Sequence, residues 1–416
     1  MKYSIVTFGC RVNQADSLRI EETLRRAGGI DAPSAHADLV VVNTCSVTAT
    51  ADQGARQTIR RIARENPRAR IVVTGCYASR RPDEVATLPN VIRVVHNEDK
   101  DRLVDVITTA VRFGDGEGAC GAPIEPGIAG RTAFTLRIQT GCEERCSYCI
   151  IPSTRGRQRS LAIADIVRDV GRVAAAGFKE IALTGVHLGS FGRDLSPSTS
   201  LVDLLSVLSQ LPADVTFRIS SLEPMDCSPE IVDLVASSGG RFAPHFHLPL
   251  QHASDRMLAL MQRPYTLEYY RRLVDRIVER LPHASIGSDM IVGFPGETDE
   301  DFECNLRYLP ASPLSHLHVF PYSDRPGTAA SVMVDKVGGT DIRSRGATLR
   351  HIAAELSRRF RQSQIGAVRP GLTINDGTVV LTDNYLKLRI APGRPRNERV
   401  KIPVPVEDSL AVVLED

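Results

Sequence analysis

The amino-acid sequence of 416 residues predicts an α/β protein that contains a parallel-sheet α/β domain, a partial (β/α)6 barrel and a small C-terminal all-β barrel. Three observations support this fold class. Short apolar runs alternate with helical patterns in residues 1–113, six further strand candidates alternate with helices in residues 131–340, and five short strand patterns crowd residues 366–416. Alternating strands and helices imply parallel sheets covered by helices, whereas crowded short strands imply a small barrel. A linker at residues 114–130 and a basic helix at residues 341–365 would connect the three domains.

The composition is that of an ordinary globular protein, with 42% hydrophobic and 24% charged residues. No apolar stretch is long enough to span a membrane, and the first residues do not resemble a secretion signal. The nine cysteines are odd in number and lie far apart, so reduced thiols that bind metal are favoured over disulfides. We therefore expect a cytoplasmic protein without a membrane partner.

Charge is distributed unevenly along the chain. The net charge is +4 for residues 1–113, −7 for residues 114–342 and +5 for residues 343–416. Basic ends around an acidic middle are a weak indication of a polyanionic partner such as RNA, and solvated helix faces would produce the same pattern.

The N-terminal domain places three cysteines just after predicted strands. Its strand patterns span residues 4–8, 39–43, 71–74 and 91–95, and its helical patterns span residues 17–27, 48–64 and 99–112, with Ser17 as the first N-cap. Cys10, Cys45 and Cys76 each follow one of the first three strands. Ligands of open α/β sheets gather at that edge, and three converging thiolates could hold an iron-sulfur cluster with one open iron. A buried cysteine can also serve simply as a small apolar side chain.

Residues 114–130 are rich in glycine, contain two prolines and lack hydrophobic periodicity, which indicates a linker. Cys120 lies within it. We expect that Cys120, Cys227 and Cys304 are not ligands, because none has a partner at metal-binding spacing.

The central domain opens with a C-x3-C-x2-C run, formed by Cys142, Cys146 and Cys149, directly after the strand candidate at residues 135–139. Three thiolates on one short loop can hold three irons of a cubane, and the fourth iron can then chelate a substrate. A structural zinc loop is the alternative. Zinc usually completes its site with a fourth Cys or His at short spacing, and none follows here, so the pattern favours an iron-sulfur cluster.

Four polar segments follow other strands of the central domain. Its later strand patterns span residues 181–184, 217–221, 246–249, 286–292 and 316–320. Six strands are too few for a closed eight-stranded barrel, so we expect an open barrel with its chemistry at the carboxyl ends. The segments that follow strands are Thr184-Gly185-Val186-His187, Ser220-Ser221-Leu222-Glu223, Gln251-His252 and Gly293-Phe294-Pro295-Gly296-Glu297-Thr298. The last segment could equally be a turn followed by a helix cap.

The C-terminal part combines the basic helix with the small barrel. The helix has one apolar face and an opposite face rich in arginine. Strand patterns near residues 372–374, 378–382, 386–390, 399–402 and 410–414 are typical of a small barrel that binds oligonucleotides. Residues 387–401 hold six basic residues against the single acid Glu398. Such clustered bases can pair with phosphates, although a solvated loop would have the same composition.

Together, these features resemble the radical S-adenosylmethionine methylthiotransferase family. The resemblance rests on the three strand-end cysteines, the C-x3-C-x2-C barrel and a terminal barrel that resembles the family's TRAM domain and contains Thr382-Asp383-Asn384-Tyr385-Leu386-Lys387. The opening Gly9-Cys10-Arg11-Val12-Asn13 is most similar to the branch that modifies threonylcarbamoyladenosine in tRNA. Two positions depart from the family pattern: Arg11 replaces a lysine, and Gln251-His252-Ala253 stands where Gln-Ser-Gly is common.

The resemblance implies two [4Fe-4S] clusters, S-adenosylmethionine as cofactor, and tRNA as substrate. Cys142, Cys146 and Cys149 would hold the cluster at which S-adenosylmethionine is cleaved reductively. Cys10, Cys45 and Cys76 would hold a second cluster, whose open iron carries the sulfur that is methylated. The methylthio group would be added to C2 of N6-threonylcarbamoyladenosine at position 37 of tRNA, and an electron donor such as flavodoxin or ferredoxin would be a further partner.

The resemblance also implies roles for other residues. Tyr148 would form an aromatic wall for the adenine of the cofactor. The remaining contacts with S-adenosylmethionine would come from Thr184, Gly185, Glu223, Gln251 and Gly293. RNA would be bound by Arg394, Arg396 and Lys401. The alternatives are a methylthiotransferase that acts on isopentenyladenosine in tRNA or on a ribosomal protein aspartate, and a non-catalytic iron-sulfur sensor that binds RNA.

Overall fold

The computed structural model describes residues 1–104, 125–127, 131–406 and 409–414. Cys120, most of the predicted linker and the predicted helix beyond residue 104 lie outside these residues. The chain divides into two compact units. Unit 1 comprises Met1–Ile124, Thr140–Arg159 and Ser323–Ser331, and unit 2 comprises Glu125–Gln139, Ser160–Tyr322 and Val332–Asp416. Unit 1 therefore combines the N-terminal domain with two short segments from much later in the sequence.

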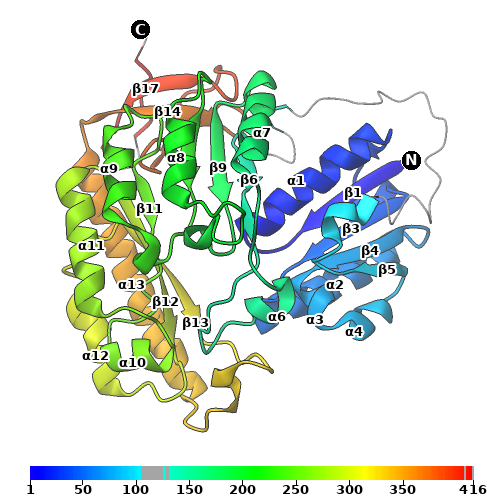
Figure 1. Ribbon diagram of the computed structural model, residues 1–416, viewed down its shortest axis with the longest axis horizontal. Helices are drawn as coiled ribbons and strands as arrows, with labels where there is room; N and C mark the ends of the chain where they lie inside the picture. Colours follow the sequence, from blue (N-terminus) through cyan, green and yellow to red (C-terminus); the bar gives the residue numbers. More distant parts are fainter. Residues whose placement is uncertain (105–124, 128–130, 407–408, 415–416) are drawn as a thin grey trace. The chain divides into compact units, whose positions relative to one another are not determined.

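Unit 1 is built on a five-stranded parallel sheet with the order β2-β1-β3-β4-β5 (Figure 1). Its strands are β1 (Lys2–Thr7), β2 (Ile30–Asp31), β3 (Leu39–Thr44), β4 (Arg70–Gly75) and β5 (Val91–Val95). Its helices are α1 (Arg11–Arg26), α2 (Ala49–Glu65), α3 (Cys76–Arg80), α4 (Pro82–Ala86) and α6 (Ile151–Arg155). The central strand β3 is apolar over four consecutive residues because both of its faces are buried. Val40 and Val42 join the core formed with α2, while Leu39 and Val41 join the core formed with α1.

The first helix begins earlier than the sequence pattern predicts. The expected N-cap, Ser17, lies buried inside α1, which starts at Arg11. The difference arises at Gly9, whose φ of +86° turns the chain directly out of β1 and gives Cys10 the N-cap position. The prediction of the N-cap at Ser17 was therefore wrong.

Unit 2 contains the predicted partial barrel. Its six parallel strands form two sheets, with the orders β10-β9-β6 and β11-β12-β13. These strands are β6 (Phe134–Arg137), β9 (Glu180–Thr184), β10 (Thr216–Ile219), β11 (His245–His247), β12 (Ser285–Val292) and β13 (His316–Pro321), and β7 (Gln139–Thr140) pairs separately with β8 (Arg159–Ser160). The helices are α7 (Ile163–Ala175), α8 (Leu201–Ser209), α9 (Pro229–Ser237), α10 (Asp255–Leu260), α11 (Leu267–Arg280), α12 (Asp299–Tyr308) and α13 (Gly339–Gln364). Within the described part of the chain, no helix has the length and apolar character needed to cross a membrane.

The C-terminal residues form a four-stranded antiparallel sheet with the order β16-β15-β14-β17. The strands are β14 (Val368–Ile374), β15 (Val379–Thr382), β16 (Lys387–Arg389) and β17 (Arg399–Pro403), and their inward side chains share one apolar core. The predicted fifth strand at residues 410–414 is replaced by isolated bridges. Ala411 pairs with Ile390 and Leu414 pairs with Lys401.

A loop of this terminal sheet closes the amino end of the barrel strands. The Tyr385 ring lies on the ring of His245, the first residue of β11, with 4.4 Å between centroids. The Arg218 guanidinium lies 5.1 Å from the Tyr385 centroid and donates to the Asp383 carbonyl at 3.0 Å. Arg218 is fully buried and forms an ion pair with Glu180 at 2.9 Å. One buried guanidinium thus joins two barrel strands to the terminal sheet.

Replacing Arg218 by methionine should destabilise unit 2 by about 3–5 kcal/mol, because Glu180 would keep a buried charge without its partner. Calorimetric unfolding measures the effect. The double variant with Glu180→Gln removes the orphaned charge and should recover part of the loss. Equal stabilities of Arg218→Met and the wild type would contradict this role.

Candidate metal centres

Three cysteines converge at the carboxyl edge of the unit 1 sheet. Cys10 follows β1, Cys45 follows β3 and Cys76 follows β4, and these three strands are neighbours in the sheet. Burial, together with the charges of Cys10 and Cys76, raises the pKa of Cys45 to about 11. The Cys45 thiol therefore lies near both other thiols.

Two glycines make this convergence possible. Gly9 has a φ of +86°, and a Cβ at this position would lie only 2.6 Å from Cys45 Sγ. Gly75 has a φ of +99°, and its Cβ would overlap the Thr44 carbonyl oxygen. Each glycine immediately precedes a cysteine, so a side chain at either position would push the strand ends apart.

Asn13 ties two of the cysteine turns together. Its side-chain amide donates to the carbonyl oxygens of Phe8 at 2.8 Å and Thr44 at 2.9 Å. These carbonyls lie on the strand ends that lead into Cys10 and Cys45. The Asn13 of the sequence motif therefore has a structural role at the cysteine edge.

The second cysteine set also belongs to unit 1, because the loop with Cys142, Cys146 and Cys149 lies within Thr140–Arg159. The backbone N–H of Cys142 donates to Gly156 O and that of Cys149 donates to Cys146 O, both at 3.1 Å. Gly141 has a φ of +75°, and a Cβ there would overlap the Arg157 carbonyl oxygen. All three cysteines are half-buried, as is Tyr148 between them.

The donor sets suit iron-sulfur clusters better than a single ion. Each set offers three sulfur atoms, the ligand type that such clusters require. Thiolates around one zinc would lie within about 4 Å of one another, given Zn–S bonds of about 2.3 Å. Among the described residues, the one group of His, Cys, Asp and Glu whose ligand atoms all lie within 4.8 Å of one another is His247, Asp289 and His318. Neither cysteine set is therefore closed around a mononuclear site.

The predicted cofactor contacts lie at strand ends of unit 2. Thr184 ends β9 and its carbonyl accepts from Ile138 N at 2.9 Å. The next residue, Gly185, packs on the Gln139 side chain, whose Oε1 accepts from Val186 N and His187 N at 2.9 Å each. Gln139 thus shapes this loop, and the absence of a side chain at Gly185 lets Gln139 and Leu188 pack against its backbone.

Glu223 and Gln251 follow β10 and β11. The Glu223 carboxylate is paired with the guanidinium of Arg263, which is buried and also contacts Tyr265 Oη at 3.1 Å. Gln251 has a φ of +69°, an unusual backbone conformation for a residue with a side chain, and its ladder bonds to Asp289 and Ile291 hold it there. Strain of this kind clusters at functional sites.

The loop after β12 is held by a buried carboxylate. Gly293, with a φ of +75°, donates its N–H to the Glu297 carboxylate, which also pairs with Arg345 at 3.2 Å and His252 at 3.4 Å. Thr298 is the N-cap of α12 and forms a capping box with Asp301. Glu297 and Thr298 therefore shape the loop and the helix start, as the alternative interpretation of this segment expected.

The sequence analysis missed a histidine cluster on the barrel strands. The Asp289 carboxylate on β12 lies 3.0 Å from His247 Nε2 on β11 and 3.2 Å from His318 Nδ1 on β13. Burial favours the neutral carboxyl, but these two hydrogen bonds outweigh it and hold the pKa of Asp289 well below its usual range. The alternation of His245 with His247 and of His316 with His318 could have revealed that these side chains share one face.

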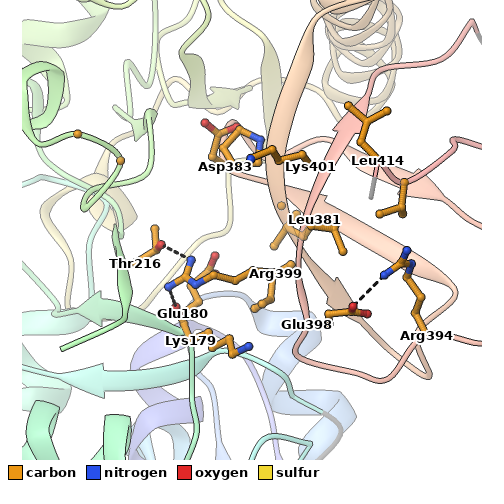
Figure 2. A pocket seen from close by; sticks show the side chains of 17 residues that line it. Lys179, Glu180, Thr216, Leu381, Asp383, Arg394, Glu398, Arg399, Lys401 and Leu414 are labelled. Carbon is orange, nitrogen blue, oxygen red and sulfur yellow. Dashed lines mark hydrogen bonds and ion pairs between the residues drawn. The ribbon is translucent and has the colours of Figure 1, made fainter. Parts of the chain in front are cut away.

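Two of the three predicted RNA-binding residues line a cavity of about 670 Å³ in unit 2 (Figure 2), and Arg396 does not. Arg394 and Lys401 line it, together with Lys179, Glu180 and Arg399. Arg394 pairs with Glu398 at 2.8 Å, and Arg396 donates to the Asn375 carbonyl. Glu180 begins β9, so this cavity lies at the amino end of a strand whose carboxyl end carries Thr184.

Comparisons with known proteins cover most of the chain. The family described as Uncharacterized protein family UPF0004 matches residues 2–97, and the Radical SAM superfamily matches residues 136–309. The chain is 36% identical to the threonylcarbamoyladenosine tRNA methylthiotransferase MtaB of Aquifex aeolicus, over 94% of this chain and 96% of that protein. It is 35% identical to the ribosomal protein uS12 methylthiotransferase RimO of Desulforudis audaxviator, over 88% of this chain and 84% of that protein.

Among solved structures, the chain is similar in fold to the radical S-adenosylmethionine methyltransferase TsrM of Kitasatospora setae, whose structure contains cobalamin and a [4Fe-4S] cluster. The TM-score is 0.56 at 17% identity, over 80% of this chain and 74% of that one. At this identity the likeness concerns the fold alone.

Replacing Gly75 by alanine should disrupt the Cys76 turn, because a positive φ and an overlap with the Thr44 backbone act together. We expect a destabilisation of unit 1 larger than the roughly 1–3 kcal/mol that a sparsely populated backbone conformation alone costs. Gly28→Ala is the matched control, since Gly28 has a φ of +83° but no atom within 4 Å of its would-be Cβ. Thermal unfolding measures the stability of both variants. Equal losses of stability would show that the overlap with the Thr44 backbone is unimportant.

Proposed function

This chain belongs to the radical S-adenosylmethionine methylthiotransferase family, and we propose that it adds a methylthio group to C2 of N6-threonylcarbamoyladenosine at position 37 of tRNA. As a member of this family it is an enzyme that transfers a sulfur-containing group. The observation that carries the proposal is the presence of two three-cysteine sets within one compact unit. The substrate is proposed from the Gly9-Cys10-Arg11-Val12-Asn13 motif and from the relatives named for this nucleoside.

The two cysteine sets would each hold one [4Fe-4S] cluster. When bound, the clusters would supply the electron that cleaves S-adenosylmethionine and the sulfur that is transferred. Gly9, Gly75 and Asn13 keep the thiols of Cys10, Cys45 and Cys76 at one edge of the sheet. Gly141 allows the close turn from which Cys142 projects.

S-adenosylmethionine would be bound by Tyr148 and by residues at four strand ends of the barrel. Gly185 and Gln251 would contribute from the loops after β9 and β11, and the backbone of Gln251 is held there at a φ of +69°. Glu223 keeps a half-exposed carboxylate that can accept hydrogen bonds from hydroxyl or amino groups, while Arg263 balances its charge. The Thr184 hydroxyl and the Gly293 loop complete the proposed set.

Arg394, Arg396 and Lys401 would contact RNA phosphates. The cavity that Arg394 and Lys401 line opens between the barrel and the terminal sheet, so it could guide a strand along the molecule. The proposal includes a cytoplasmic location and an electron donor such as flavodoxin or ferredoxin, because tRNA and reducing equivalents both occur there.

One competing substrate has specific support. The identity with the uS12 methylthiotransferase is nearly the same as that with the tRNA enzyme, so a ribosomal protein aspartate is the second candidate. Methylthio-nucleoside analysis of tRNA from cells with and without this gene separates the two. An unchanged nucleoside profile alongside a modified ribosomal protein would favour the second candidate.

Replacing cysteines of one set should affect the reaction differently from replacing cysteines of the other set. Reconstituted protein should bind about eight irons per chain, and joint replacement of Cys10, Cys45 and Cys76 by alanine should leave about half. Cys142→Ala should abolish cleavage of S-adenosylmethionine, whereas Cys45→Ala should keep cleavage and lose methylthio transfer. Parallel assays of deoxyadenosine and modified nucleoside decide this. Loss of cleavage in Cys45→Ala with full iron at the other set would refute the division of roles.

Joint replacement of Arg394, Arg396 and Lys401 by glutamine should weaken tRNA binding. If these residues contact phosphates, the slope of log K against log salt should flatten by up to about 0.9 per lost contact. A variant with Arg272, Arg276 and Arg280 replaced by glutamine loses the same charge from α11 and serves as the control. Equal tRNA affinity and slope in the two variants would exclude the terminal sheet from the RNA site.

A further inference from the structure

A buried charge network in unit 1 connects the two cysteine loops. Lys100 Nζ and Arg155 Nη2 both contact the Asp16 carboxylate, at 3.0 Å and 3.2 Å. The side chains of Lys100 and Arg155 are 2% exposed and that of Asp16 is fully buried. Water therefore screens none of these charges.

Arg155 reaches both loops. It ends α6, six residues after Cys149, and its Nη1 lies 3.3 Å from Thr140 Oγ1, just before Cys142. Its Nη2 donates to Asn13 Oδ1 at 2.5 Å. Asn13 and Asp16 stand on α1, which begins directly after Cys10. The guanidinium is thus a direct link between the loop of one cysteine set and the helix that begins at the other.

A second contact supports the same connection. The Asn97 amide donates to Thr154 O on α6 at 2.8 Å and approaches Cys76 Sγ at 3.8 Å. The residue before Arg155 is therefore held next to the third cysteine of the N-terminal set.

Arg155 carries the fixed positive charge of the network, because burial lowers the pKa of Lys100. Lys100 and Arg155 share one carboxylate. Lys100 also donates to Asn43 Oδ1 at 3.1 Å, and Arg155 also donates to Asn13, to Thr140 Oγ1 and to the Cys76 side chain. Burial disfavours the charged guanidinium, but attraction to Cys76, Asp16 and Cys10 outweighs it and raises the pKa of Arg155. Buried cations are retained only where an anion compensates them. Besides Asp16, Cys76 and Cys10 are the groups whose negative charge would compensate Arg155.

We propose that Arg155 is a positioning residue that fixes the two cysteine loops to each other and, through its charge, raises the reduction potential of the cluster held by Cys10, Cys45 and Cys76. This inference rests on the proposed function, since it presumes that this cluster forms. Adding an electron makes a cluster more negative, so a fixed cation beside it favours the reduced state, and net charge near the sulfurs is an established control of cluster potential.

The test uses the full chain with Cys142, Cys146 and Cys149 replaced by alanine, so that the EPR signal reports the N-terminal cluster alone. Redox titration of Arg155→Gln should give a more negative midpoint potential than the parent. Arg155→Lys keeps the charge and should lie close to the parent. Arg157→Gln is the control, because Arg157 is two residues away on the same segment and its side chain is 91% exposed.

Asp16→Asn removes a negative charge near the cluster, whereas Arg155→Gln removes a positive one, so the two variants should shift the midpoint potential in opposite directions. Asp16→Asn removes this negative charge from the network and keeps the Arg155 side chain itself, so the midpoint potential should become more positive. A potential that is unmoved in Asp16→Asn would overturn the inference even if Arg155→Gln failed to fold. A cluster that assembles in Arg155→Gln with an unchanged potential and only a lower melting temperature would reduce Arg155 to a structural role.

The parent of these variants is the chain in which Cys142, Cys146 and Cys149 are replaced by alanine, and its iron content tests the proposed function independently of Arg155. If it binds no iron after reconstitution, the N-terminal cluster and with it the proposed function fail, whatever the variants do. If it binds about four irons, the variants then decide the role of Arg155 alone.

Discussion

The parallel pairing of β3 with β1 on one side and β4 on the other is the constraint on which the rest of unit 1 depends. Parallel strands end at the same edge, so residues that follow them are brought together although 31 to 35 positions separate them in sequence. The pairing requires a central strand buried on both faces, and the apolar run of β3 meets that requirement. The cysteine edge is thus a result of core packing together with Gly9 and Gly75, which leave room for the turns before Cys10 and Cys76.

A long-range contact explains why unit 1 is discontinuous in sequence. Arg325, from the segment Ser323–Ser331, is buried against the N-terminal domain. Its guanidinium donates to Ser46 Oγ at 2.9 Å and pairs with Asp52 at 3.2 Å, next to Cys45. Asp52 also pairs with Arg80. The backbone of Ala330 donates to Ser147 O at 2.8 Å, within the second cysteine loop. This late segment therefore contacts both cysteine regions.

The sequence was sufficient for the fold class, the family and the enzyme class, because periodicity and cysteine spacing are local signals. It failed at the start of α1, since a positive φ at Gly9 cannot be distinguished from an ordinary loop glycine. It also gave no indication of the Lys100–Asp16–Arg155 network. Lys100 lies on a predicted helical pattern, whereas Asp16 and Arg155 lie outside the predicted helices, and only their packing makes the three buried partners. The partners of Asp289 were also missed, because its histidine neighbours lie on other strands and are distant in sequence.

The Tyr385 loop has a consequence for how the terminal sheet could be exchanged or removed. Its ring covers His245 and lies 6.3 Å from His316, and its neighbours accept the hydrogen bonds of Arg218. Asn384 donates to the His283 carbonyl at 3.0 Å, just before β12. A chain truncated after α13 would therefore open the barrel floor to solvent and leave the Arg218 guanidinium with Glu180 as its remaining partner. A terminal sheet exchanged for that of a relative would have to bring a turn that fits His245 and Arg218 as Thr382–Tyr385 does.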